Sequence, residues 1–74
     1  MQLNQDWTII ASVEGGEILA MDTGTVIRVS YPEHIDIEGI KDLLTVLDIE
    51  LGDEVTLEPG PSKGETIAVF SYPE

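Results

Sequence analysis

The sequence has no cysteine and a single histidine. Without cysteine the chain forms no disulfide framework, no thiolate nucleophile and no cysteine-based metal site. His34 has no partner motif for catalysis, because G-x-S-x-G, phosphate-binding-loop and H-E-x-x-H patterns are all missing. We therefore expect His34 to be a structural or surface residue and the protein to be non-catalytic, without a cofactor.

Basic residues are also scarce. Arg28, Lys41 and Lys63 stand against 15 acidic residues, and the formal net charge is -12. Nucleic-acid binding depends on lysine and arginine side chains that neutralise phosphates, so direct binding of DNA or RNA is not expected. An anionic membrane surface is disfavoured for the same reason. The expected partner is a protein with a basic surface, such as a nucleic-acid-binding complex.

Long apolar runs are missing as well. No stretch approaches the length of a transmembrane helix, and MQLNQDWTII at the start lacks the basic lead and apolar run of a secretory signal, so a cytoplasmic location is expected. The 42% hydrophobic content is too high for a disordered acidic tail. With 74 residues, the chain is expected to form one domain over 1–74, and its small core is compatible with homodimer formation.

Short apolar runs separated by glycine and proline indicate the secondary structure. Their order is β-β-β-α-β-β, which predicts an α+β fold with a small, mainly antiparallel sheet and one amphipathic helix. The expected strands cover 7–13, 17–21, 25–31, 53–58 and 66–72, and the expected helix covers 37–48.

The helix and the strand after it show clear periodicity. Asp36 is placed to cap the helix, in which apolar residues recur at helical spacing. In the strand 53–58, Val55 and Leu57 alternate with polar residues, which is typical of a half-buried strand. The helix is expected to pack on the sheet through Ile37, Ile40, Leu44 and Leu47.

The acidic residues are the candidate functional groups. Carboxylates four residues apart on a helix are separated by about 6 Å and those at alternate strand positions by about 7 Å, close to the spacing of successive phosphates. Such rows imitate a nucleic-acid backbone and fit a basic groove. An equally weighted interpretation is that the charges only keep the protein in solution. The predicted partner-binding residues are Glu38, Asp42, Asp48, Asp53, Glu54 and Glu58.

The cluster Asp48, Glu50, Asp53 and Glu54 is a candidate site for a divalent cation. Carboxylate oxygens suit Ca²⁺ or Mg²⁺, but the spacing does not match the D-x-[DN]-x-[DN]-G-x₅-E calcium loop. A solvated helix end and turn is the favoured interpretation, and no dedicated metal site is expected.

The stretch from Thr25 to Phe70 combines a strand ending in proline, a short helix and a G-D-x-V turn that starts a hairpin. It resembles the swapped-hairpin family of AbrB- and MazE-like proteins, which implies a dimer with interlocked hairpins acting as an antitoxin or regulator. That family contacts DNA through basic residues, whereas Arg28 and Lys41 here stand among acids. The matching positions are Gly24, Pro32, Leu47, Gly52, Asp53 and Val55.

A short, strongly acidic, cysteine-free chain without catalytic motifs also resembles, in overall character, the phage-encoded inhibitors of host defences. These include DNA-mimic anti-CRISPR and anti-restriction proteins. The resemblance implies a non-catalytic inhibitor in the host cytoplasm that binds the basic nucleic-acid-binding surface of a defence complex. The alternatives are the antitoxin or regulator and a structural component of a phage particle.

Overall fold

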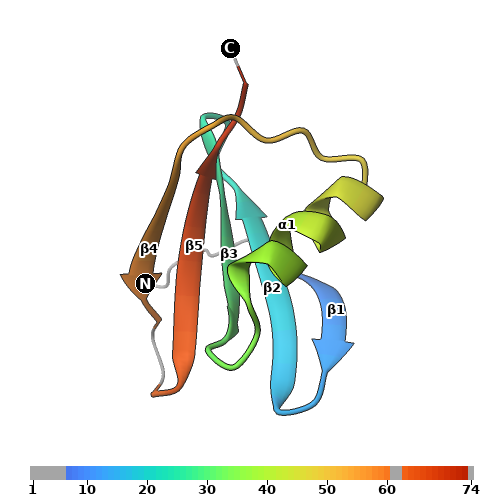
Figure 1. Ribbon diagram of the computed structural model, residues 1–74, viewed down its shortest axis with the longest axis vertical. Helices are drawn as coiled ribbons and strands as arrows, with labels where there is room; N and C mark the ends of the chain where they lie inside the picture. The colour runs from blue at the N-terminus through green and yellow to red at the C-terminus, as the bar shows by residue number, and fades with distance from the viewer. Residues whose placement is uncertain (1–6, 61–62, 74) are drawn as a thin grey trace.

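A computed structural model describes residues 7–60 and 63–73, which form a five-stranded antiparallel sheet with one helix on one of its faces (Figure 1). The architecture confirms the predicted α+β fold and its element order. The elements are β1 (Thr8–Val13), β2 (Gly16–Asp22), β3 (Val26–Pro32), α1 (Ile37–Val46), β4 (Val55–Pro59) and β5 (Glu65–Ser71).

Two glycines make the turns that connect the first three strands. Gly15 lies between β1 and β2 with φ of 93°, and Gly24 lies between β2 and β3 with φ of 96°. Glycine adopts this left-handed conformation without the steric penalty of a Cβ atom. The amide of Gly24 also donates to Oδ1 of Asp22 over 2.8 Å, which closes the second turn. The first three strands therefore form a meander.

The last two strands join the sheet in a non-sequential order. β5 pairs with β3 of the same chain, from Val26 opposite Ser71 to Pro32 opposite Glu65. β4 pairs with β5, and the complete order is β1-β2-β3-β5-β4. The chain thus crosses one face of the sheet as α1 and enters β4 beyond β5 (Figure 1). As a result, β1 and β4 are the two edges of the sheet.

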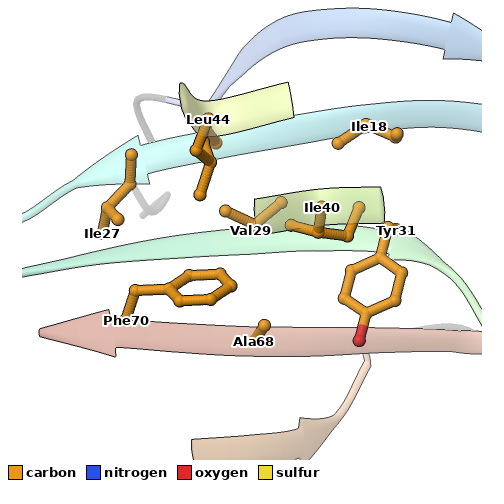
Figure 2. Close-up of a cluster of buried hydrophobic side chains, with 9 residues drawn as sticks. Ile18, Ile27, Val29, Tyr31, Ile40, Leu44, Ala68 and Phe70 are labelled. Carbon is orange, nitrogen blue, oxygen red and sulfur yellow. The ribbon is translucent and has the colours of Figure 1, made fainter. Parts of the chain in front are cut away.

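The hydrophobic core lies between α1 and one face of the sheet (Figure 2). Side chains alternate between the two faces of a strand, so every second residue of β2, β3 and β5 points toward the helix. β4 contributes no residue to this core. The buried residues are Ile18, Ala20, Ile27, Val29, Tyr31, Ile40, Leu44, Ala68 and Phe70.

The opposite face of the sheet carries an ion pair that spans β5. Nη2 of Arg28 lies 2.7 Å from Oε1 of Glu58. Both side chains are partly exposed, so the pair adds at most about 1 kcal/mol to stability. Its geometry shows that Glu58 points away from the side of the sheet on which α1 lies.

The helix is shorter than predicted. It ends at Val46 rather than at Asp48, because the amide of Ile49 donates to the carbonyl of Leu44 over 2.9 Å, which closes a Schellman motif. Leu47 is therefore the C-cap and is 43% exposed, so the prediction that it packs on the sheet is wrong. The predicted packing of Ile37, Ile40 and Leu44 is confirmed.

The outer strand, β4, is less buried than the sequence predicts. Val55 and Leu57 point to the helix side of the sheet, because they pair with Phe70 and Ala68 of β5. They are nevertheless 39% and 57% exposed. The prediction of a half-buried strand is wrong, because β4 lies outside β5, beyond the part of the sheet that α1 covers.

The burial of the helix residues predicts that truncating two of them will change the free energy of unfolding by very different amounts. Leu44→Ala should lower the free energy of unfolding by about 2–5 kcal/mol, because it leaves a cavity beneath the helix. Val46→Ala, at a residue that is 80% exposed, should change it by less than about 0.5 kcal/mol. Urea denaturation of both variants measures this, and equal effects would contradict the assignment of the buried face.

Candidate functional site

The helix presents acidic side chains on its outer side. Glu38 and Asp42 are exposed, one turn apart, on the side opposite Ile40 and Leu44. Residues at this spacing have Cβ atoms about 5–6 Å apart. Asp36 occupies the predicted N-cap position, but its carboxylate makes no capping hydrogen bond. These carboxylates are therefore available to a partner.

Asp48 lowers the stability of the fold through both its backbone conformation and its negative charge. Its φ is 68°, a left-handed conformation that favours glycine. It also follows the C-terminus of α1, where the helix dipole disfavours negative charge and no basic residue occupies the last turn. The amide of Asp48 donates to the carbonyl of Thr45 over 2.9 Å, which holds the residue in this conformation. Its exposed carboxylate therefore stands just beyond the helix end.

Three more acids follow in the connection between α1 and β4. Glu50, Asp53 and Glu54 are all exposed. In Figure 1 this connection runs from the end of α1 across the end of the sheet to the start of β4. The backbone therefore links the acids of the helix to those at the entry of the outer strand.

Gly52 ties this connection to the end of β5. Its amide donates to the carbonyl of Ser71 over 2.7 Å. A Cβ atom at Gly52 would lie 2.8 Å from Oγ of Ser71 and 3.0 Å from the carbonyl oxygen of Tyr72, so a larger residue would push the connection away from β5. An open depression of about 480 Å³ lies beside this contact, lined by Leu51, Gly52, Asp53, Glu54, Ser71, Tyr72 and Pro73.

We call the exposed carboxylates of the helix and the connection the acidic arc. All the predicted partner-binding residues except Glu58 belong to it. Glu58 lies on the opposite face of the sheet, paired with Arg28. Glu50 was missing from the predicted set, although its position between Asp48 and Asp53 in the sequence is a signal that includes it. The acidic arc consists of Glu38, Asp42, Asp48, Glu50, Asp53 and Glu54.

The arc is not neutralised by neighbouring cations. Within residues 7–60 and 63–73, the ion pair of Arg28 and Glu58 is the only salt bridge. In the same residues, no group of three His, Asp or Glu side chains is placed to hold a metal ion. The arc therefore offers a partner a series of exposed carboxylates with no salt-bridge partner in the part of the chain that the structure describes.

Three further side chains with titratable groups lie outside the arc. His34 is exposed, and its Cε1 lies 3.1 Å from the place where a Cβ atom of Gly15 would stand. Burial raises the pKa of the Tyr31 hydroxyl. Burial and then the nearby Asp22 carboxylate raise the pKa of the Tyr72 hydroxyl. Both tyrosines therefore stay protonated at neutral pH.

No family model, curated protein sequence or solved structure matches this chain. Among the described residues, no helix has the length and apolar character needed to cross a membrane. The functional assignment therefore depends on the residues and their geometry.

The strained position of Asp48 gives a measurable prediction. Asp48→Gly should raise the free energy of unfolding by about 1 kcal/mol, because it removes both the steric penalty of the left-handed conformation and the charge at the helix end. Asp48→Asn removes only the charge and should give a smaller gain, about 0.3–1 kcal/mol. Urea denaturation at low ionic strength measures both changes. Loss of stability in Asp48→Gly would show that the carboxylate stabilises the fold.

Proposed function

We propose that the protein is a non-catalytic inhibitor that places its acidic arc in the basic nucleic-acid-binding groove of a host defence complex, of the CRISPR or restriction type. The observation that carries the proposal is the series of exposed, unpaired carboxylates from Glu38 to Glu54. A basic groove attracts such a series by the same electrostatic forces with which it attracts phosphates.

The excess of charge supports a role in binding. A net charge of magnitude about 2–8 is enough to keep a small domain in solution. This chain carries -12, which adds self-repulsion to the folded state. A basic partner surface lowers that repulsion in the complex, because it places positive charge beside the carboxylates.

Asp48 supports the proposal in a second way. Residues held in unfavourable backbone conformations cluster at functional sites, where the strain is tolerated for the sake of the activity. Here the strain places a carboxylate between the acids of the helix and those of the connection. We infer that the carboxylate of Asp48 serves binding rather than the stability of the fold.

Neutralising three of the six carboxylates of the arc should weaken binding at least tenfold. The test variant combines Asp42→Asn, Asp48→Asn and Asp53→Asn. The matched control combines Glu14→Gln, Glu17→Gln and Glu33→Gln, which removes the same charge from exposed residues outside the arc. Each immobilised protein is used to capture partners from host-cell lysate, with and without excess duplex DNA and at raised salt.

The wild type and the control should capture a nucleic-acid-binding complex that DNA and salt both release, and the arc variant should capture at least tenfold less. Three losses of about 0.5 kcal/mol each would suffice for this. Equal capture by the arc variant would contradict the placement of the site. Capture of a small toxin-like protein that DNA does not release would instead support the antitoxin alternative.

A further inference from the structure

The outer edge of β4 has unused backbone hydrogen-bonding groups. The amide of Ser71 donates to the carbonyl of Glu54, and the amide of Gly60 donates to the carbonyl of Glu65. In an antiparallel pair, residues that bond to the partner strand alternate with residues whose backbone groups point away from it. Thr56 and Glu58 therefore bond to β5, and the amides and carbonyls of Val55 and Leu57 point outward.

The same two residues expose apolar side chains. Val55 is 39% exposed and Leu57 is 57% exposed, both on the helix side of the sheet. No described strand lies beyond β4. The edge thus combines free backbone groups with an apolar strip, which is the combination that an added strand uses.

The other edge of the sheet is not equivalent. The pairing of β1 with β2 is interrupted by an irregularity between Ile9 and Ala11. Such bulges twist an edge and protect it from pairing. β4 keeps an unbroken register with β5 from Val55 to Pro59, and although Pro59 offers no outward amide, Val55 and Leu57 do.

The charges beside β4 select the strand that can pair with it. Glu54 and Glu58 alternate with Val55 and Leu57 along the chain. If two copies of β4 paired antiparallel about Thr56, Glu54 of each copy would face Glu58 of the other, and like charges directly opposite one another are destabilising. Two copies that each carry a net charge of -12 would also repel one another in other registers, so a second copy is disfavoured as the occupant. Lysine or arginine facing Glu54 would be attracted.

We propose that the outer edge of β4 binds an extended segment of a partner protein in which apolar and basic residues alternate. The segment adds a sixth strand, and its backbone bonds to Val55 and Leu57. Its basic side chains face Glu54 and lie beside Glu58, which already pairs with Arg28. This inference rests on the proposed function for the basic character of the partner, and it adds a surface and a binding mode that the acidic arc does not supply.

The direct test uses a synthetic peptide, acetyl-Val-Lys-Val-Lys-Val-Lys-Val-amide, and the full ¹⁵N-labelled chain. Saturation with the peptide should slow hydrogen exchange at the amides of Val55 and Leu57, because these amides become hydrogen-bonded. The amides of Thr56 and Glu58, which already bond to β5, should change little. The control peptide replaces each valine by glycine and keeps the charge, and it should bind more weakly and leave the exchange rates unchanged. Failure of the valine–lysine peptide to bind, or unchanged exchange at Val55 and Leu57, would overturn the proposal.

A pair of variants isolates the backbone contribution. Leu57→Pro removes an outward amide and leaves the bonds between β4 and β5 intact, since proline is accepted at an edge strand whose amide faces solvent. Leu57→Thr removes the apolar side chain and keeps the amide. The peptide should bind about tenfold more weakly to Leu57→Pro than to Leu57→Thr. Equal affinities would show that the amide is not used.

The same variants separate this inference from the proposed function. If the lysate complex is captured equally by wild type and Leu57→Pro but lost in the arc variant, the arc is the site and β4 is not. If capture is lost in Leu57→Pro and kept in both Leu57→Thr and the arc variant, β4 is the site and the arc is not.

Discussion

A single short helix has to cover a five-stranded sheet, and most of the surface features follow from this constraint. A helix of ten residues is about 15 Å long, whereas the outer strands of a five-stranded sheet lie about 19 Å apart. α1 packs through Ile40 and Leu44 on β2, β3 and β5, which supply all the strand residues of the core. β4 is left outside this cover, and its apolar residues remain exposed.

The constraint also determines where charge is placed. The exposed side chains on the outer side of α1 and in the connection to β4 make no contact with the core. Carboxylates can therefore occupy these positions without loss of core packing. Gly52 fixes the connection against Ser71, so the acids after it stand at a defined end of the sheet.

Periodicity in the sequence was enough to predict the six elements and the fold class. The apolar spacing that contains Ile40 and Leu44 identified the buried side of the helix, because helical spacing and burial are directly linked. The helix end was missed, since the Schellman motif uses Asp48 where glycine is the usual signal. Strand order could not be predicted, because local alternation is the same for a central strand and an edge strand. The exposure of Leu57 depends on that order and was therefore beyond the sequence, whereas alternation along the strand already places Glu58 on the face opposite Val55 and Leu57.

Glu54 connects the two proposed binding surfaces. It ends the acidic arc, and its carbonyl is also the first hydrogen-bond acceptor for β5 at the entry of β4. A partner whose basic groove binds the arc would therefore lie next to the free edge of β4. The two contacts differ in physical character, since charge pairing weakens steeply with salt while backbone hydrogen bonds and apolar contacts do not. Binding through both would combine a fast, charge-guided encounter, which salt suppresses, with short-range contacts at the sheet edge, a combination that neither a purely acidic surface nor a bare sheet edge provides.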